Sequence, residues 1–413
     1  MTLNNKNIVA IVGGGPAGMM ASIVASENKD NDVYLFEKNN SLGRKLLLTG
    51  KGRCNITNSE TDIKKFISFF GKNGKFLHHA FNVFFNEDLL NFFRKKGVEF
   101  VYERGNRVFP KSEDSNEILN VLKKYLKENN VKIETNKSLL SINKKKDKFV
   151  LKFGDFDFIA DKVIIACGGK SYPGTGSTGE IFNICKKLGH TIVNPVPSLV
   201  PIVLKERFIS RLEGLSLKNV KASISKNNKE IISQFGDMLF TNNGVSGPIV
   251  LSLSKYICRE ELKNLILIID LKSALSIEQL NIRIRREMND KNIIYKSLLK
   301  LLLPSNLIPI FLEILEVDEN KKIKHLNKDE INELVDLLKH FEFHIERLES
   351  FGYSIVTSGG VSIKEISPMT MESKKIPGLF FAGESIDIDG ETGGFNLQAA
   401  FSTGFIAGKS VSE

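Results

Sequence analysis

Short apolar runs alternate with amphipathic stretches through the first third of the chain. Apolar residues at 8–12 and 32–36 predict two buried strands, and the stretch between them, at about 16–28, predicts a helix. A helical pattern at 114–129 is followed by a strand-like run at 131–134. Strands that alternate with helices in this way are typical of a parallel sheet in an α/β domain.

The next stretch adds a different kind of sheet. Alternating apolar and polar positions at 139–142, 149–153 and 156–159 predict a small antiparallel ribbon. The apolar run at 162–166 predicts a further buried strand of the first sheet, and a helix is predicted at about 180–188.

The pattern changes at about residue 195. Three prolines, from Pro195 to Pro201, predict a linker, and short β-rich runs follow between 217 and 241. Residues from about 273 to 350 are predicted to be mostly helical. The final part of the chain returns to strands and glycines and ends in an apolar helix at about 395–408.

A chain of 413 residues is too long for one hydrophobic core, so we expect two or three domains. The expected units are a discontinuous domain of residues 1–195 and 351–413, an inserted β-rich domain of residues 196–272, and an inserted helical subdomain of residues 273–350.

The composition resembles that of an ordinary soluble protein, with 42% apolar and 26% charged residues. The formal net charge is +10, but the lysines are spread along the chain, which favours a solvated surface over a nucleic-acid footprint. The four cysteines form no C-x-x-C pair. No apolar run approaches the ~20 residues of a membrane helix, and the N-terminus lacks a signal-peptide pattern. Together these features predict a cytoplasmic protein with no membrane partner.

A glycine-rich turn joins the first predicted strand to the first helix. Residues 13–18, Gly-Gly-Gly-Pro-Ala-Gly, have the G-x-G-x-x-G spacing, which lets the backbone turn at Gly13 and lets a diphosphate approach at Gly15. The N–H groups and positive dipole end of the following helix would face that diphosphate. Glu37 ends the second strand, where its carboxylate can accept hydrogen bonds from ribose hydroxyls. This spacing predicts a dinucleotide site.

A second glycine-rich segment lies near the C-terminus. A strand that ends in Ala382-Gly383-Glu384 would bring a carboxylate to the ribityl hydroxyls of a flavin. The turn at Gly393-Gly394 opens a helix whose N–H groups can face the flavin N1 and C2 carbonyl, where negative charge accumulates on reduction. Paired with the N-terminal turn, this segment favours a flavin site over a loop that only caps a core helix.

Four motifs in combination resemble one family. They are residues 13–18, the run from Gly43-Arg44-Lys45 through Gly52-Arg53-Cys54-Asn55 to Asn58, Thr357-Ser358-Gly359-Gly360-Val361, and the segment 376–397. With them the chain resembles the BaiN-like NAD(P)/FAD-dependent oxidoreductases, a group that includes proteins labelled aminoacetone oxidase. The likeness runs end to end. It implies an α/β fold, namely a two-dinucleotide-type FAD-binding Rossmann-like domain with an inserted β-barrel and helical subdomain, and FAD held non-covalently.

The resemblance also assigns residues to the cofactor. It places the first glycine-rich turn on the FAD diphosphate and Glu37 on the adenosine ribose, with Arg44 and Lys45 neutralising phosphate charge. Residues 49–55 would pass close to the isoalloxazine ring. The complete predicted set is Gly13, Gly15, Pro16, Ala17, Gly18, Glu37, Lys38, Arg44, Lys45, Thr49, Gly50, Gly52, Arg53, Cys54, Asn55, Ala166, Gly168, Gly383, Glu384, Gly393, Gly394, Asn396 and Leu397. We expect Cys54 to be a small buried residue rather than a redox thiol.

Two further patterns carry weaker signals. A second G-x-G-x-x-G at residues 174–179 is separated from its strand by Pro173 and the residues before it, so a loop that lines the flavin or substrate cleft is favoured over a nicotinamide site. His340 and His344 lie four apart on a predicted helix, but no third ligand accompanies them, so no metal site is expected.

We therefore expect a cytosolic FAD oxidoreductase in which hydride passes through flavin N5. The resemblance favours NAD(P)H-linked reduction of a small organic substrate such as a conjugated enone, with NAD(P)H as a transient co-substrate. Two alternatives stay open: a flavin amine oxidase that takes an aminoacetone-like substrate and O2, and a flavoprotein that binds or acts on tRNA. The sequence assigns no proton donor, although Asp237, Tyr172 and Arg53 are candidates, and it predicts no oligomeric state.

Overall fold

The computed structural model describes residues 6–154, 156–287 and 293–412. The chain forms two compact units. Unit 1 combines the chain up to Ser198 with the chain from Phe351 onward, and unit 2 is the insertion Leu199–Ser350. Separate clusters of buried apolar side chains lie within unit 1 and within unit 2.

The centre of unit 1 is a five-stranded parallel sheet. Its strand order is β19-β10-β1-β2-β6, with bounds Leu379–Phe381, Lys162–Ile165, Asn7–Val12, Asn31–Phe36 and Lys132–Glu134. Apart from the partly buried Ile8, the apolar residues of β1 and β10 are fully or almost fully buried, as expected for strands covered on both faces. Because β19 pairs with β10, the two ends of the chain contribute to one sheet.

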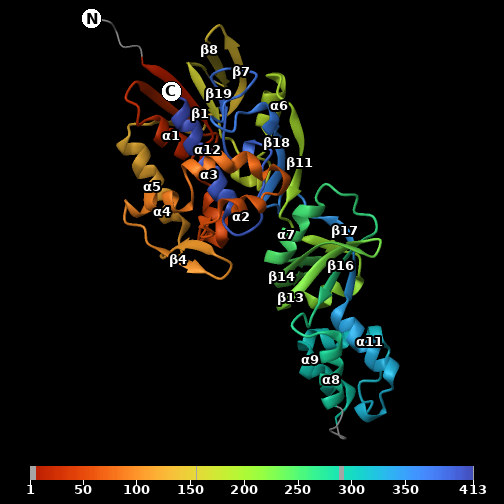
Figure 1. The fold of residues 1–413 in the computed structure, drawn as a ribbon. Coiled ribbons are helices and arrows are strands. Elements are labelled where there is room, and N and C mark those ends of the chain that lie inside the picture. The colour runs from red at the N-terminus through yellow and green to blue at the C-terminus, as the bar shows by residue number, and fades with distance from the viewer. Residues whose placement is uncertain (1–5, 155, 288–292, 413) are drawn as a thin grey trace, which may run out of the picture. The chain divides into compact units, whose positions relative to one another are not determined.

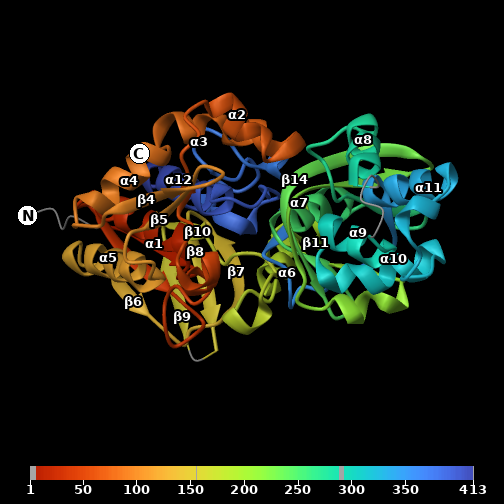
Figure 2. The same ribbon diagram turned by 90° about the horizontal axis from the view of Figure 1, so that it is seen from below.

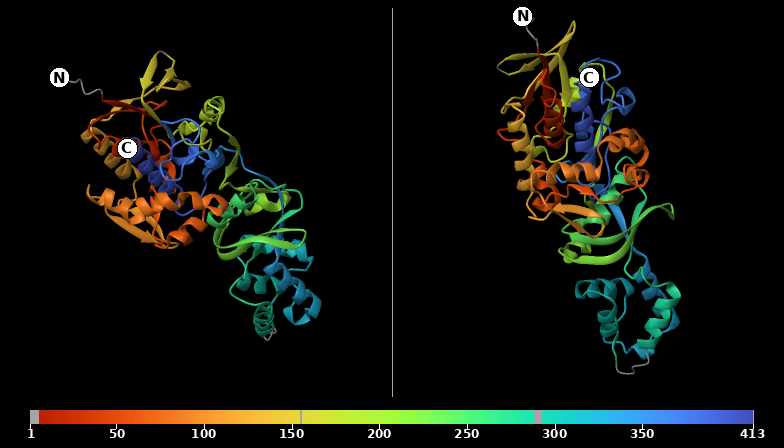
Figure 3. Two further views of the ribbon diagram at one scale, coloured as in Figure 1. Left: turned by 45° about the horizontal axis from the view of Figure 1, so that its top comes forward. Right: turned by 60° about the vertical axis from the view of Figure 1, so that its left-hand side comes forward.

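Two helices from opposite ends of the chain pack against each other in unit 1. Helix α1 (Pro16–Ala25) lies beside helix α12 (Phe395–Ser410), as the red and blue ribbons show in Figures 1 and 3. Small residues allow this close approach, since a Cβ atom at Gly404 would collide with the carbonyl oxygen of Ala17.

The remaining elements of unit 1 surround this core. Its other helices are α2 (Ile63–Ser68), α3 (His78–Val83), α4 (Asn86–Arg94), α5 (Ser115–Glu128) and α6 (Glu180–Lys187). Its small sheets are β3-β5-β4 (Thr57–Asn58, Arg107–Pro110, Phe100–Glu103), β7-β8-β9 (Leu139–Lys145, Lys148–Phe153, Asp157–Ala160) and β11-β18 (Ile192–Ser198, Val356–Val361). Among the described residues, no helix is both long enough and apolar enough to cross a membrane.

The predicted linker after residue 195 is wrong for its first part. Pro195 and Pro197 lie in β11, which pairs antiparallel with β18. Proline is tolerated there because, among the described residues, β11 is paired along one edge only, and its register shifts between Val193 and Val196.

Unit 2 contains a closed barrel and a group of helices. The barrel order is β12-β15-β14-β13-β16-β17, with bounds Ile202–Leu204, Gly244–Ser246, Lys229–Thr241, Ser216–Lys226, Leu265–Asp270 and Phe341–Leu348. Helix α7 (Pro248–Ile257) packs on β14. The helices that Figure 2 shows gathered in this unit are α8 (Ile277–Glu287), α9 (Tyr295–Leu302), α10 (Ile308–Leu315) and α11 (Lys328–Lys339).

The prediction of helix up to residue 350 is wrong at its end. Helix α11 ends at Lys339, and the alternately buried residues of β17 pair with β16 and β12 to close the barrel. His340 and His344 therefore do not share a helix. Their Nδ1 atoms lie 2.8 Å from Asp336 and 2.9 Å from Glu206, respectively.

Candidate functional site

A pocket in unit 1 lies where the parallel strands end. It is lined by the turn after β1, the residues after β2, the segment after β10 and the segment after β19. The carboxyl ends of the strands are where open α/β sheets bind ligands. The predicted residues that line it are Gly13, Gly15, Pro16, Ala17, Glu37, Lys38, Arg44, Lys45, Thr49, Ala166, Gly168, Gly383, Glu384, Asn396 and Leu397.

The first glycine-rich turn forms a cradle at the start of α1. Gly13 has a φ of +111°, which favours glycine, and a Cβ atom at Gly18 would collide with the Gly13 carbonyl oxygen. A Cβ atom at Gly15 would have no protein atom within 4 Å and would project into the pocket. The cradle therefore offers backbone N–H groups and open space to an anion.

Glu37 is a buried carboxylate held by backbone and side-chain donors. Its Oε2 accepts the N–H of Gly14 at 2.8 Å, and its Oε1 accepts the backbone N–H and the side-chain amide of Asn39 at 2.8 and 2.7 Å. An ionised carboxylate has about four lone-pair positions, so these three donors leave room for a hydroxyl.

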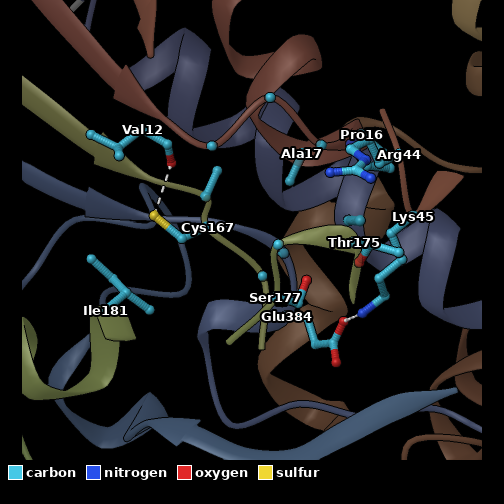
Figure 4. A pocket seen from close by; sticks show the side chains of 18 of the residues that line it. Val12, Pro16, Ala17, Arg44, Lys45, Cys167, Thr175, Ser177, Ile181 and Glu384 are labelled. Carbon is cyan, nitrogen blue, oxygen red and sulfur yellow. Dashed lines mark hydrogen bonds and ion pairs between the residues drawn. The ribbon is translucent and has the colours of Figure 1, made fainter. Parts of the chain in front are cut away.

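Arg44 and Lys45 point to different partners, as Figure 4 shows. Arg44 follows Gly43, whose N–H donates to the Gly14 carbonyl at 2.9 Å, and its side chain donates to the Asn39 side-chain oxygen at 2.9 Å. Lys45 instead forms an ion pair with Glu384 and donates to the Ser171 hydroxyl at 2.6 Å. Of the two cations that the sequence analysis assigns to phosphate, Arg44 is therefore the one placed at the glycine-rich turn.

Glu384 lines the pocket and is the centre of a hydrogen-bonded cluster that extends into the protein interior. Besides the ion pair with Lys45, its Oε1 accepts the hydroxyl of Ser171 at 2.7 Å and the backbone N–H of Thr357 at 2.6 Å. These four residues come from four separate segments, and the cluster fixes the carboxylate that follows β19.

The structure does not bring every predicted residue to the pocket wall. Those outside its lining are Gly18, Gly50, Gly52, Arg53, Cys54, Asn55, Gly393 and Gly394. Cys54 is fully buried, and Arg53 is paired with Glu103 and Glu113 and stacked on Phe109. Gly394 precedes α12, and a Cβ atom there would collide with the carbonyl oxygen of Thr57. Gly18, Gly50 and Gly394 therefore bring segments together rather than line the cavity, whereas a Cβ atom at Gly52 would meet nothing within 4 Å.

The second glycine motif does line the pocket. Residues 175–180 contribute to its wall, and α6 begins directly after Gly179, whose φ is +79°. Lys38 donates to the Thr178 hydroxyl at 2.8 Å and so joins this loop to the end of β2. The interpretation as a cleft-lining loop fits this placement.

Sequence reasoning missed several pocket residues. Asn39 lines the pocket, and Ser171 lies outside the lining but donates to Glu384; neither carries a recognisable motif of its own. Three further lining residues follow β6, the outermost parallel strand: Lys137, Ser138 and Leu139. Their place after the carboxyl end of a parallel strand is the sequence feature that could have predicted them.

Burial shifts the pKa of two groups in or beside the pocket, Cys167 and Tyr172. Burial raises the pKa of the Cys167 thiol to about 12, and Cys167 donates weakly to the Val12 carbonyl (Figure 4). Burial likewise raises the pKa of Tyr172. Within the part of the chain that the structure describes, no three His, Cys, Asp or Glu side chains are grouped to hold a metal ion.

Comparisons with known proteins agree with this architecture. The family model of the HI0933-like protein Rossmann domain matches residues 7–410. The chain is 30% identical to a 3-dehydro-bile acid delta(4,6)-reductase of Clostridium scindens, with 98% of this chain and 99% of the relative covered. It is 31% identical to a ribosomal RNA dihydrouridine synthase of Haemophilus influenzae, with both chains covered completely.

A solved structure supports the fold. A 3-ketosteroid-delta4-(5alpha)-dehydrogenase from Rhodococcus jostii RHA1 superposes with a TM-score of 0.53 at 13% identity, and the match covers 100% of this chain and 98% of that one. The predicted fold class, an FAD-binding Rossmann-type α/β domain with an inserted β-barrel and helices, is confirmed.

Proposed function

Since the chain belongs to the HI0933-like Rossmann-domain family, we propose that it is an FAD-dependent oxidoreductase that reduces a carbon–carbon double bond conjugated to a carbonyl group. The observation that carries the proposal is the pocket of unit 1. It joins a glycine-rich turn open to an anion, the Glu37 carboxylate, which has room for a hydroxyl, and the Glu384 carboxylate from the opposite end of the chain.

The residues present fit FAD along its length. The cradle at Gly15 and the N-terminus of α1 would hold the diphosphate together with Arg44. Glu37 would accept hydrogen bonds from the adenosine ribose, and Glu384 from the ribityl hydroxyls. FAD would supply hydride at N5.

Lys45 and Ser171 would orient Glu384. Their hydrogen bonds keep its carboxylate aimed into the pocket, and the Lys45 ammonium balances its negative charge. Backbone N–H groups in the first turn of α12, beside the pocket residues Asn396 and Leu397, would face the pyrimidine side of the flavin. Those N–H groups favour negative charge, which accumulates there on reduction.

The names of two relatives support the reaction class. A delta(4,6)-reductase of a 3-dehydro-bile acid and a dihydrouridine synthase both add hydrogen to a double bond conjugated to a carbonyl. We extend this common chemistry to the present chain: hydride adds to the carbon β to the carbonyl, and a proton adds to the α carbon. NAD(P)H would return two electrons to the flavin.

Anaerobic spectroscopy tests this proposal. We expect the purified protein to be yellow and its flavin band to bleach with NADH or NADPH, then to recover when a conjugated enone is added. Bleaching by aminoacetone alone, with recovery in O2, would support the amine-oxidase alternative instead. A protein that stays colourless after incubation with FAD would contradict both.

Uridine in RNA is a second candidate substrate. The observation that favours it is the dihydrouridine synthase relative. Ribosomal RNA and tRNA transcripts are incubated with the reduced protein and analysed by mass spectrometry for hydrogen added to uridine. Hydrogen added to uridine in ribosomal RNA or tRNA would identify RNA as the substrate, and hydrogen added only to the enone would identify a small molecule.

A further inference from the structure

One side chain, that of Asn39, links three parts of the pocket. Its Nδ2 donates to Glu37 at 2.7 Å and to the Thr175 carbonyl at 3.0 Å, while its Oδ1 accepts from Arg44 at 2.9 Å. Both amide hydrogens and the amide oxygen are therefore engaged. The backbone beneath it is also fixed, because the Asn39 carbonyl accepts the N–H of Asn136 at 2.9 Å.

The loop that Asn39 reaches, residues 172–180, is held by polar contacts; we call it the strap. It begins at Tyr172, a non-glycine residue with a φ of +48°, and Thr175 to Glu180 line the pocket. Gly176 packs so closely on Asn39 that a Cβ atom there would collide with the amide nitrogen. Lys38 adds bonds to Thr178 at 2.8 Å and to Glu180 at 3.2 Å.

The strap has little apolar anchorage. None of its residues is both apolar and buried, since Ser177 alone in the strap is buried. A segment without buried apolar side chains opens at low free-energy cost, so its closure depends on the polar contacts just described.

We propose that Asn39 is a positioning residue that couples the adenosine end of the site to the strap, so that the strap closes over a bound adenine dinucleotide and slows its release. This inference rests on the proposed function. A ribose hydroxyl on Glu37 would fix the carboxylate that orients the Asn39 amide. That amide would in turn hold Thr175, while its oxygen keeps Arg44 at the diphosphate.

The release rate of FAD tests the coupling. Asn39→Ala removes two donated bonds and one accepted bond, so we expect FAD to dissociate about tenfold faster, as followed by the recovery of flavin fluorescence. The association rate should stay near the wild-type value, because the strap closes after binding. If Asn39 only supported the local fold, Asn39→Ala would slow FAD association as well.

Hydrogen exchange gives a readout that is independent of activity. In the wild-type protein, FAD should slow exchange of the strap amides, and in Asn39→Ala this protection should be lost. Asn39→Asp should release FAD faster still, because a second carboxylate beside Glu37 repels it and cannot donate to Thr175.

Two further variants keep the test decisive. Asn28→Ala removes an amide of the same type outside the pocket lining, where its Nδ2 donates to Ser412, and should leave FAD release unchanged. Lys38→Met removes two further side-chain contacts of the strap, those with Thr178 and Glu180, and should also accelerate release. It provides a second test if Asn39→Ala does not fold. Unchanged release and strap exchange in the Asn39 and Lys38 variants would overturn the coupling. A wild-type protein that binds no FAD would instead refute the proposed function.

Discussion

At the scale of single residues, Glu365 shows how local donors overcome burial. Burial alone would raise its pKa, but hydrogen bonds from Lys375 at 2.7 Å and from the hydroxyl and N–H of Thr191 lower the pKa from 4.5 to about 2. As pH falls, the unfolded chain takes up this proton before the folded one. The carboxylate therefore stabilises the fold above pH 4.5, and this stabilisation is lost as the pH approaches about 2.

We predict that Glu365→Gln lowers the free energy of unfolding by ~1–3 kcal/mol near neutral pH. The difference from wild type should shrink as the pH falls from 4.5 toward about 2, as measured by urea unfolding at a series of pH values. Glu99→Gln, which breaks an exposed pair with Lys111, serves as the control and should change stability little. A difference that does not vary with pH would contradict this account.

Buried thiols give a second residue-scale prediction. Cys54 and Cys185 are buried, and burial raises the pKa of both thiols, so almost no thiolate is present near neutral pH. Iodoacetamide should leave both unlabelled in the native protein and label both after unfolding in urea, as read by peptide mass spectrometry. The partly exposed Cys258 provides the comparison within the same digest. Rapid labelling of native Cys54 would show that the segment around it opens.

The sequence predicts best those site residues whose role is set by the local backbone. Gly13 and Gly15 sit in a strand–turn–helix whose spacing is itself the signal. Asn39 and Ser171 escape prediction because their partners lie on other segments, such as Thr175 and Glu384. Residues that become hydrogen-bond partners only in the folded protein are not marked by any motif or spacing in the sequence.

At the scale of elements, a buried polar chain fixes the start of α12. The Thr57 hydroxyl donates to Gln398 at 2.6 Å, the Gln398 amide donates to Ser402 at 3.0 Å, and Ser402 donates to the Phe84 carbonyl at 2.7 Å. Thr57, Gln398 and Ser402 are all inaccessible to solvent. The chain therefore ties β3, α12 and the end of α3 together beside the pocket.

We predict that Thr57→Val destabilises the protein by ~1–3 kcal/mol, because the Gln398 oxygen then lacks its donor in a buried place. Denaturant unfolding measures the loss. Thr57→Ser retains the hydroxyl and should recover most of the stability. Equal stability of the valine and serine variants would mean that the hydroxyl contributes nothing.

The contact of α1 with α12 gives a packing prediction. Gly404→Ala places a methyl group against the Ala17 carbonyl, so the helices must separate, at a cost of ~1–3 kcal/mol. Thermal unfolding followed by circular dichroism measures the effect. Gly154→Ala, where an added Cβ atom meets nothing within 4 Å, is the matched control. Equal melting temperatures for the two variants would contradict the close contact.

The sequence predicts elements well where one hydrophobic pattern is present, and poorly where two patterns overlap or conflict. The strands and helix around the first glycine-rich turn follow the pattern to within a few residues. In β17, Phe341, Phe343 and Ile345 alternate with polar residues, but the preceding helical run masks this period of two. The prolines of β11 predict a linker instead of a strand. The strand forms nevertheless, because β11 pairs with β18 along one edge and this pairing accommodates proline.

At the scale of the whole molecule, the chain passes between the two units twice. Within each unit, the residues next to these two crossings are hydrogen-bonded to each other. In unit 1, Ser198 donates its N–H to the Ser354 hydroxyl at 3.2 Å. In unit 2, the Pro201 carbonyl accepts the N–H of Glu349 at 3.1 Å. Termini that lie close together are what a domain needs in order to be inserted into another without disturbing its fold. The proposed three-part division of the chain stays a prediction, since the helices and barrel share one apolar cluster.

This arrangement predicts that each unit folds without the other. Residues 199–350 expressed alone should unfold cooperatively, because the barrel closes on itself and its core lies within the insertion. Unit 1 with a short glycine linker between Ser198 and Phe351 should still bind FAD, because all the residues that line the pocket belong to unit 1. Calorimetry and FAD fluorescence titration provide the measurements. If linked unit 1 folds but has lost FAD, part of the cofactor site must come from the insertion, and the pocket of unit 1 would not suffice as the binding site.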